Sequence, residues 1–354
     1  MLKNTLYLDT IAGKQTNRIP VWFMRQAGRS LPEYKALKGE DSILKVLEDP
    51  KRSAEITLQP VKRHDVDAAV LYSDIMVPLK AAGVNLEIQE GLGPVVRDSF
   101  TDTDDIKRID VDIMPDNLKS QIETINLIKS TSEVPLIGFI GAPFTLSCYL
   151  LDGRPTKNWT KTQTMILENP YLMKSLFDRL ASLVIKSIEV QVKAGVDAIQ
   201  IFDSWAGIIN PRVFTEFLKA PLEQIISFAT NKNIPITYFG LKNFSQMSII
   251  SKLKPSVVGI DSTMDISQAR DVLDSSITIQ GNLNPVSCLA EFSSLKGELE
   301  EVITQGLKSK RELPATGDKG LSSGYIFNLG HGVLPETDPD TLTGIVKFIH
   351  DFKF

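Results

Sequence analysis

The chain has 354 residues, of which 42% are hydrophobic and 23% charged, and its formal net charge is −4. This composition is that of a globular protein and excludes wholesale disorder. Proteins that bind nucleic acid through phosphate contacts are usually basic, so the acidic balance disfavours that class while leaving room for a local basic pocket for a small anion. The length fits two average domains or one large α/β barrel.

Cysteine content and the N-terminal sequence indicate where the protein works. Two cysteines, Cys148 and Cys288, exclude a disulfide framework and favour a reducing compartment, so we expect a cytoplasmic protein. No apolar segment follows the first residues, so no signal peptide is expected. The uncharged stretch 134–151 approaches the length of a membrane span. Its prolines and glycines, and its flanks Glu133 and Asp152, instead predict a buried strand, a turn and a helix start.

Short apolar runs alternate with longer amphipathic stretches along the chain, and no linker or fixed-period repeat divides it. The runs are rich in β-branched and aromatic residues, which is typical of buried parallel strands. The stretches between them have helical patterns, of which 171–194 is the clearest, and Asn169-Pro170 is typical of a helix start. In chain order, the runs cover residues 20–24, 67–72, 135–140, 197–202, 235–239, 257–260, 277–280 and 325–329.

Eight strands that alternate with helices predict a (β/α)8 barrel of the TIM type, formed as a single domain by residues 1–354. A doubly wound sheet is the alternative. The dinucleotide-binding signature of such sheets is absent, because Gly91-Leu92-Gly93 lacks the third glycine and a following helix. The segment 83–112 fits neither repeating unit and suggests a small hairpin inserted after the second strand.

Active sites of such barrels lie at the carboxyl ends of the strands, so the residues directly after each run are candidates. Arg25 and Arg29 follow the first run among apolar neighbours, and we expect them to bind an anion, although they also fit one face of an exposed turn. Asp74 follows the second run and is a candidate catalytic carboxylate, with a helix N-cap as its alternative role. His331 lies between two glycines, which allow backbone to approach a ligand closely.

Other polar residues carry weaker signals. Asp203 and Asp261 also follow apolar runs, where capping or hydrogen bonds to neighbouring loops are alternatives to a site role. His64 and His350 are expected at surface or helix positions. A metal site is poorly supported, because the three histidines and two cysteines lack ligand spacing. The sequence leaves open a magnesium site made of carboxylates alone.

At these positions the sequence resembles the uroporphyrinogen decarboxylase family, whose members convert uroporphyrinogen to coproporphyrinogen in haem biosynthesis. The similarity extends from Arg18 to Phe352, and the order of the motifs is highly specific. They are MRQAGR at 24–29, DAAVLYSDI at 67–75, GFIGAPFTLSCYLLDG at 138–153, AGVDAIQIFDSWAG at 194–207 and FNLGHGVLPETDPD at 327–340.

The resemblance implies a single-domain barrel, usually a homodimer, that acts on a small-molecule substrate without metal or organic cofactor and without nucleic acid or membrane. By similarity, Asp74, Arg25 and Tyr149 are catalytic. The sequence departs from the family at Lys38, where many members carry arginine, and at Ser30 and Ser262, where aromatic residues are common. The substrate-binding positions implied are Arg25, Arg29, Lys38, Asp74, Tyr149, Ser204 and His331.

The chemistry of that reaction agrees with these residue types. Each of four acetate side chains on the tetrapyrrole becomes a methyl. Protonation of a pyrrole carbon makes the ring an electron sink, so carbon dioxide leaves without pyridoxal or thiamine. We expect guanidinium and ammonium groups to hold the substrate carboxylates and Asp74 to stabilise positive charge on the pyrrole nitrogen. The proton donor stays open between Arg25, a bound water and His331.

Two other functions are compatible with the sequence. One is a zinc-dependent corrinoid or methionine-type methyltransferase of the same superfamily, which the low cysteine count disfavours. The other is a non-catalytic porphyrin-binding protein, which keeps the basic residues and has no need of Asp74. Release of carbon dioxide from the reduced substrate separates these alternatives from a decarboxylase.

Overall fold

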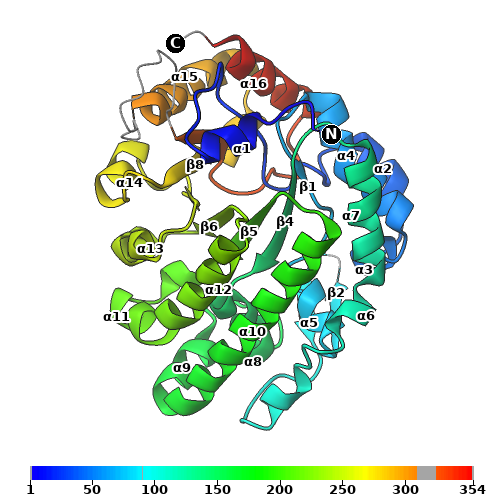
Figure 1. Ribbon diagram of the computed structural model, residues 1–354, viewed down its shortest axis with the longest axis vertical. Coiled ribbons are helices and arrows are strands. Elements are labelled where there is room, and N and C mark those ends of the chain that lie inside the picture. The colour runs from blue at the N-terminus through cyan, green and yellow to red at the C-terminus, as the bar shows by residue number, and fades with distance from the viewer. Residues whose placement is uncertain (1, 90, 309–323, 353–354) are drawn as a thin grey trace.

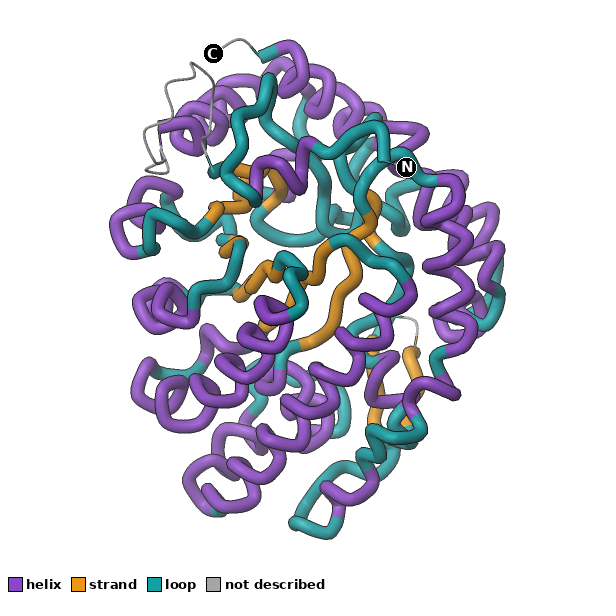
Figure 2. Tube along the Cα trace, viewed as in Figure 1, coloured by secondary structure: helices purple, strands orange, loops and turns teal. Residues whose placement is uncertain are grey.

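The computed structural model of the protein describes residues 2–89, 91–308 and 324–352. At its centre is a curled parallel sheet of seven strands, surrounded by helices (Figures 1 and 2). The α/β class predicted from the sequence is therefore confirmed. In their order across the sheet, the strands are β1 (Ala69–Val70), β4 (Leu136–Gly141), β5 (Ala198–Asp203), β6 (Ile236–Gly240), β7 (Val257–Gly259), β8 (Thr278–Leu283) and β9 (Tyr325–Leu329).

Helices connect consecutive strands and cover the outside of the sheet (Figure 1). This is the arrangement that parallel strands require, because each must be joined to the next by a crossover. The helices are α1 (Leu6–Ile11), α2 (Pro32–Lys38), α3 (Ile43–Leu47), α4 (Pro50–His64), α5 (Val77–Ala81), α6 (Met114–Asn117), α7 (Lys119–Thr131), α8 (Pro143–Asp152), α9 (Thr160–Glu168), α10 (Pro170–Ala194), α11 (Pro211–Val213), α12 (Lys219–Asn231), α13 (Met247–Leu253), α14 (Ile266–Val272), α15 (Phe292–Lys308) and α16 (Pro339–Asp351).

Seven of the eight predicted runs overlap the strands of this sheet, four of which extend one to three residues beyond the run. The first run, residues 20–24, forms no regular strand but lies next to two of them. Val21 makes a parallel bridge with Phe327 of β9. On its other side, the carbonyl of Val21 accepts a hydrogen bond of 2.8 Å from the backbone N–H of Asp67, just before β1.

The concave side of the sheet carries a chain of buried amides. The indole Nε1 of Trp22 donates to Oε1 of Gln280 at 3.1 Å, and Nε2 of Gln280 donates to Oε1 of Gln200 at 3.1 Å. Gln200 lies on β5 and Gln280 on β8, with β6 and β7 between them in the sheet. These hydrogen bonds therefore cross the interior of the curled sheet and connect residues 20–24 to it.

The predicted hairpin after the second apolar run is confirmed. The strands β2 (Leu86–Gln89) and β3 (Gly93–Val96) pair antiparallel and form a sheet of their own. The backbone N–H of Val96 donates to the carbonyl of Gly153 at 2.7 Å, and that of Phe100 to the carbonyl of Leu150 at 2.8 Å. These bonds attach the inserted segment to the end of α8.

The predicted helix over 171–194 is confirmed as α10, with local signals at both ends. The side chain of Asn169 accepts a hydrogen bond of 3.1 Å from the N–H of Leu172, and Pro170 occupies the first position, where no backbone donor is needed. Gly195 ends the helix at a φ of 114°, a conformation that glycine adopts without strain.

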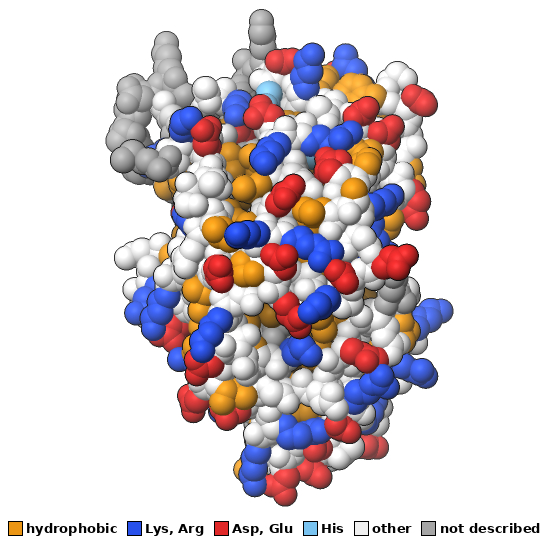
Figure 3. All heavy atoms as spheres, turned by 90° about the vertical axis from the view of Figure 1, so that its right-hand side faces the viewer, with side chains coloured by type: hydrophobic (Ala, Val, Ile, Leu, Met, Phe, Trp, Pro, Cys, Tyr) orange, Lys and Arg blue, Asp and Glu red, His pale blue; other side chains and the backbone are white. Residues whose placement is uncertain are grey.

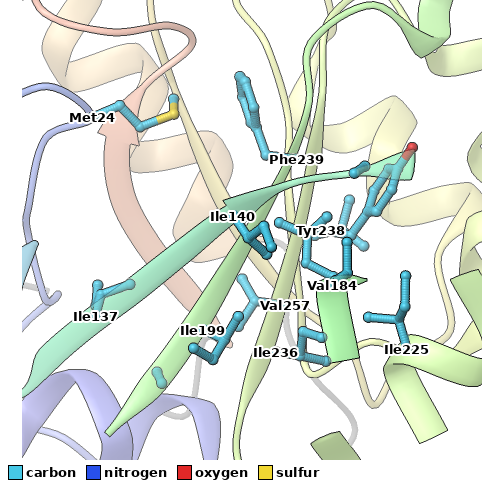
Figure 4. Close-up of a cluster of buried hydrophobic side chains, with 14 of the residues drawn as sticks. Met24, Ile137, Ile140, Val184, Ile199, Ile225, Ile236, Tyr238, Phe239 and Val257 are labelled. Atoms are coloured by element: carbon cyan, nitrogen blue, oxygen red, sulfur yellow. The ribbon is translucent and has the colours of Figure 1, made fainter. Parts of the chain in front are cut away.

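Helix α10 packs closely against β4. A Cβ atom on Gly138 would collide with Oε1 of Gln191, so only glycine leaves room for that side chain. The buried amide of Gln191 accepts from the N–H of Phe139 at 3.1 Å and donates to its carbonyl at 3.2 Å. Figure 4 shows the apolar layer, with Val184 of α10 and Ile225 of α12 beside side chains of the sheet.

The outer surface carries both charge signs. On the face in Figure 3, acidic and basic side chains are interspersed. The ion pairs of the protein surface include those of Arg63 with Glu33 and with Asp340. Among the described residues, no helix combines the length and the apolar character that crossing a membrane requires.

Candidate functional site at the carboxyl-end rim

Five of the predicted site residues follow segments that end at the same edge of the sheet, here called the carboxyl-end rim. Asp74 follows β1, Ser204 follows β5 and His331 follows β9, whereas Arg25 follows residues 20–24. Tyr149 lies in α8, the helix directly after β4. Because the strands are parallel, their carboxyl ends meet at one edge, where barrel enzymes place their chemistry.

Arg25 has an unusual backbone conformation and a closely packed side chain. Its φ of 61° lies in the left-handed region, which is uncommon for residues other than glycine. A Cβ atom on Gly332 would collide with Cδ of Arg25 and would lie 2.7 Å from its Cγ. The second glycine around His331 is therefore needed to make room for Arg25. The first, Gly330, lies against the backbone of Ser262 in the same way.

Arg25 and Arg29 place two positive charges beside each other. Burial lowers the pKa of Arg25, and repulsion from Arg29 lowers it further, whereas the charges of Asp74 and Tyr149 act in the opposite direction. Both arginine side chains are nevertheless accessible to solvent. A ligand arriving from solvent can therefore reach both guanidinium groups.

Neither arginine pairs with a carboxylate among the described residues. Within residues 2–89, 91–308 and 324–352, the ion pairs and side-chain hydrogen bonds of the chain include none from Arg25 or Arg29. Structural arginines in this protein behave differently, since Arg18 pairs with buried Asp67 and Arg52 with Asp41. Two adjacent, unpaired guanidinium groups are suited to hold anionic groups of a ligand.

Asp74 is the carboxylate whose charge acts on Arg25. Burial raises the pKa of Asp74, while a hydrogen bond of 2.9 Å from the N–H of Met76 and the charge of Arg25 lower it. The helix after it, α5, begins at Val77. The alternative role as a helix cap applies in part, because Oδ1 accepts a hydrogen bond within the turn that precedes α5. Oδ2 receives no hydrogen bond in the described part of the chain and retains its full capacity as an acceptor.

Tyr149 is held by two tryptophans. Its ring packs edge-on against Trp159, with centroids 4.9 Å apart, and Trp159 packs against Trp205 at 5.1 Å. Burial raises the pKa of Tyr149 to about 12, and the negative charge of Asp74 contributes in the same direction. The phenol therefore stays protonated at neutral pH and can donate a hydrogen bond. No sequence pattern singles out Trp159, which follows α8 in a loop and not at the end of a strand.

His331 is neutral at physiological pH. Burial and the charge of Arg25 lower its pKa. The backbone N–H of Gly332 donates to Nδ1 at 2.7 Å, so the ring hydrogen lies on Nε2. A neutral imidazole in this tautomer offers one N–H donor and no positive charge.

Ser204 is half-buried directly after Asp203. Asp203 is itself buried and accepts hydrogen bonds from Thr145 Oγ1 at 2.9 Å and Tyr238 OH at 2.8 Å. Burial raises the pKa of this carboxyl to about 6. Because Thr145 lies one turn before Tyr149 in α8, Asp203 fixes α8 to the end of β5. Asp203 therefore has a structural role, the alternative to a site role that the sequence left open.

Two further predicted residues make their hydrogen bonds outside this group, although the charge of Asp261 acts on His331. Asp261 accepts from the backbone N–H of Lys242 at 2.6 Å and from Thr263, so it organises neighbouring loops. Lys38 is the last residue of α2, where its Nζ lies 3.5 Å from the carbonyl of Gly39. No contact in the described part of the chain joins Lys38 to Arg25 or Asp74, and its role stays a prediction.

An apolar surface that the sequence does not predict adjoins these polar groups. Phe202, the residue before Asp203, is half-buried, and its ring packs edge-on against buried Phe239 with centroids 5.9 Å apart. Both lie next to the strand ends, in register with each other. In the sequence, each is an aromatic residue at the last apolar position of a strand. Core packing accounts for the same pattern, so the pattern does not indicate a ligand.

The described residues contain no cluster of three or more histidine, cysteine, aspartate or glutamate side chains arranged to hold a metal ion. Both cysteines are buried as free thiols. Burial raises the pKa of Cys148, and it raises that of Cys288 to about 12. Neither thiol is therefore a ready ligand or nucleophile.

Solved structures share this fold. A methyltransferase from Methanosarcina mazei superposes with a TM-score of 0.79 over 99% of this chain and 98% of its own, at 18% sequence identity. A putative B12-independent methionine synthase from Listeria monocytogenes gives a TM-score of 0.54, covering 95% of this chain and 97% of its own, at 15% identity. At these identities the likeness concerns the fold alone.

Sequence comparison is more specific. The family model described as uroporphyrinogen decarboxylase (URO-D) matches residues 2–352. A uroporphyrinogen decarboxylase from Mycobacterium marinum is 39% identical over 99% of this chain and 98% of its own length. One from a Geobacillus species is 37% identical with the same coverage. The chain therefore belongs to the uroporphyrinogen decarboxylase family.

Proposed function

We propose that the protein removes carbon dioxide from the four acetate side chains of uroporphyrinogen and thereby produces coproporphyrinogen. The observation that carries this function is the group formed by Arg25, Arg29 and Asp74. The guanidinium of Arg25 acts on the desolvated carboxyl of Asp74, and the charge of Arg29 acts on Arg25. Neither guanidinium is paired within the described residues, and both lie at the rim where the family motifs converge. A carboxylate-rich substrate with pyrrole N–H groups matches both halves of this group.

The positive groups bind substrate carboxylates in this proposal. Arg25 and Arg29 form charge-assisted hydrogen bonds with acetate or propionate groups. Lys38 contributes a further positive charge from the end of α2. Half-buried Phe202, backed by buried Phe239, offers an apolar surface to the pyrrole rings. Ser204 and the Nε2–H of His331 provide neutral hydrogen-bonding groups at the same rim.

The reaction proceeds on one acetate arm at a time. A proton adds to the pyrrole carbon beside the one that bears the arm, and the ring becomes a cation. The bond between the arm's methylene and its carboxylate then breaks, carbon dioxide leaves, and the electron pair moves toward the ring as an exocyclic double bond. The terminal carbon takes a second proton and the ring carbon loses the first, which leaves a methyl group. Each cycle consumes one proton and releases one carbon dioxide.

Asp74 stabilises the ring cation. Its Oδ2 has no partner in the described part of the chain, so it can accept from pyrrole N–H groups as their positive charge develops. Fixed charges in a desolvated site stabilise such a transition state strongly, because no reorganisation is needed when the charge appears. Tyr149, protonated and held by Trp159, donates a hydrogen bond in the same region.

Among the candidate proton donors, the environment favours Arg25. His331 is neutral, and its remaining N–H is a very weak acid. Burial and the neighbouring Arg29 lower the pKa of Arg25 and thus make its guanidinium a better acid than an exposed one. A water molecule held between Arg25 and the substrate is the alternative route for the same proton.

The substrate supplies its own electron sink, so we propose that the reaction needs no metal or organic cofactor. We further propose that the whole chain forms one (β/α)8 barrel domain, with residues 20–24 as the eighth member. The contacts of Val21 with Phe327 and Asp67 support closure of the sheet at this point. Residues 1, 90, 309–323 and 353–354 of that domain lie outside the described residues.

A homodimer in the cytoplasm completes the proposal. Four large apolar side chains are exposed in segments that follow β5, β6 and β8, all at the carboxyl-end rim. Exposed apolar side chains gathered in this way are typical of an interface, and their burial against a second copy of the chain supports the dimer. Sedimentation analysis tests it: the unmodified protein should sediment as a dimer, and substitution by aspartate at two of these positions should give monomers. The four residues are Ile208, Phe244, Val286 and Leu289.

Turnover of the reduced substrate tests the function. Purified protein is incubated with uroporphyrinogen under anaerobic reducing conditions, and the oxidised products are separated by their number of carboxylates. We expect products with seven, six, five and finally four carboxylates. Recovery of the eight-carboxylate compound alone, from protein that is folded by circular dichroism, would contradict the proposal and favour a carrier that binds without reacting.

A further inference from the structure

The backbone of Arg25 needs support from its surroundings. Its left-handed φ of 61° is disfavoured for a residue with a side chain, and such conformations persist where neighbouring structure imposes them. Two buried amide side chains, Gln26 and Asn328, make hydrogen bonds to the turn that carries Arg25. Neither touches the solvent-accessible side of the site, since both are 0% exposed.

Gln26 ties the turn to β1. Its Oε1 accepts from the backbone N–H of Phe23 at 3.0 Å, and its own backbone N–H donates to the carbonyl of Phe23 at 3.0 Å. Its Nε2 donates to the carbonyl of Ala68 at 3.0 Å. Ala68 immediately precedes β1, the strand that leads to Asp74. Gln26 therefore fixes the turn of Arg25 relative to the strand of Asp74.

Asn328 ties the other side of the turn to β9. Its Oδ1 accepts from the backbone N–H of Met24 at 3.0 Å and from that of Leu329 at 2.8 Å. Beyond the end of β9, the backbone N–H of Val333 donates to the carbonyl of Met24 at 2.8 Å. His331 lies between Asn328 and Val333 in the chain. Met24 is therefore hydrogen-bonded to one residue before this histidine and to one residue after it.

We propose that Gln26 and Asn328 are positioning residues that hold the guanidinium of Arg25 between Asp74 and His331. Together they form a clamp: one amide reaches the strand of Asp74, and the other reaches the strand of His331. The clamp acts on catalysis through Arg25 alone and makes no contact with substrate. This inference rests on the proposed decarboxylation, which it deepens by assigning roles to two side chains that face away from the substrate.

A matched glutamine elsewhere separates positioning from general stability. Gln191 is equally buried and makes the same kind of backbone bonds, accepting from the N–H of Phe139 and donating to its carbonyl, and it also donates to Oγ of Ser187 at 3.1 Å. It lies on α10, on the outer side of the sheet. Loss of either amide leaves a buried backbone donor and acceptor unpaired, so both losses destabilise the fold to a similar degree. Only the loss of Gln26 releases the turn of Arg25.

The test compares Gln26→Met with Gln191→Met, since methionine matches glutamine in length without forming these bonds. We expect similar decreases in the thermal unfolding midpoint for the two variants. Gln26→Met should lower kcat/KM for uroporphyrinogen at least tenfold, whereas Gln191→Met should stay within about twofold of the unmodified protein. Asn328→Leu releases the other side of the clamp and carries the same expectation, and it decides the question if Gln26→Met does not fold.

A double-substitution cycle shows whether the clamp acts through Arg25. In an Arg25→Ala background, measured by single turnover with enzyme in excess, adding Gln26→Met should change the rate by no more than about twofold. A loss there as large as in the unmodified background would overturn the proposal, as would equal activity of Gln26→Met and Gln191→Met. Failure of the unmodified protein and of Gln191→Met to turn over substrate would instead contradict the proposed decarboxylation itself.

Discussion

Replacement of Asp74 by asparagine separates its electrostatic role from its structural one. The side-chain oxygen that accepts from the N–H of Met76 at 2.9 Å is kept, and asparagine serves such turns about as well as aspartate. Only the negative charge is lost. If that charge stabilises the substrate cation, kcat should fall by about 10²–10³, the usual effect of removing one preorganised electrostatic group.

Stability should change in the opposite direction. Burial raises the folded-state pKa of Asp74 above its ordinary value of 3.8, so the ionised carboxylate destabilises the fold. This destabilisation is absent below the unfolded-state pKa, grows as pH rises toward the folded-state pKa, and is complete above it. Asp74→Asn should therefore unfold at a higher temperature than the unmodified protein at pH 7, with the difference vanishing as pH falls below the unfolded-state pKa.

The two readouts are the steady-state rate of carboxylate loss and the thermal unfolding midpoint at several pH values. Asp74→Glu serves as the control, because it keeps the charge and displaces it by one methylene, so its kcat should lie between those of the other two proteins. A normal kcat in a folded Asp74→Asn variant would refute the catalytic assignment. It would leave the turn before α5 as the whole role of this residue.

Four other substitutions or treatments have defined outcomes. Gly332→Ala places a Cβ against Cδ of Arg25 and should lower kcat/KM at least tenfold, whereas Gly297→Ala, which meets no atom within 4 Å, should leave it unchanged. Arg29→Ala removes a charge-assisted bond of roughly 1.5–3 kcal/mol and should lower kcat/KM by about tenfold to a hundredfold; unchanged kinetics would refute its contact with substrate. Lys38→Arg should retain activity, because the longer fork still reaches a carboxylate, and a tenfold loss would speak against a simple charge role. Dialysis against a strong chelator should leave the rate intact, and recovery of a lost rate by added zinc or magnesium would contradict cofactor independence.

The arrangement of the site follows from the sequence because strand ends in a parallel sheet are fixed in space. Each apolar run identifies a strand or a segment beside one. The polar residue that follows the run must then lie at the carboxyl-end rim. Asp74 and His331 are located in this way, as is Asp203, which precedes Ser204. Tyr149 lies inside the helix that follows its strand, so its assignment rests on family resemblance and not on the pattern.

The pattern of apolar runs does not predict the buried contacts that hold the site residues in place. Gln26 follows Arg25 in the chain, and nothing in its type or spacing indicates that its amide reaches Ala68, 42 residues away. The glycines beside His331 suggest room for a ligand, yet the space they leave is occupied by Arg25 and Ser262. Such contacts depend on side-chain packing between segments that only the folded chain brings together.

For Lys38, the sequence predicts a contact that the structure does not test. Its charge and its place in the motif suggest a contact with substrate, and the end of α2 leaves its ammonium beside the carbonyl of Gly39. A long, flexible side chain at a helix end has many accessible positions, so neither its type nor its place in the fold determines its partner. The Lys38→Arg variant addresses this point directly.

The central claim is tested most directly by stoichiometry. Metal-depleted protein is incubated anaerobically with uroporphyrinogen in D₂O, and both the carbon dioxide released and the deuterium in each new methyl group are measured. The mechanism predicts four molecules of carbon dioxide for each four-carboxylate product and one solvent-derived deuteron in each new methyl. Binding of the substrate without release of carbon dioxide, or release that depends on added metal, would contradict it.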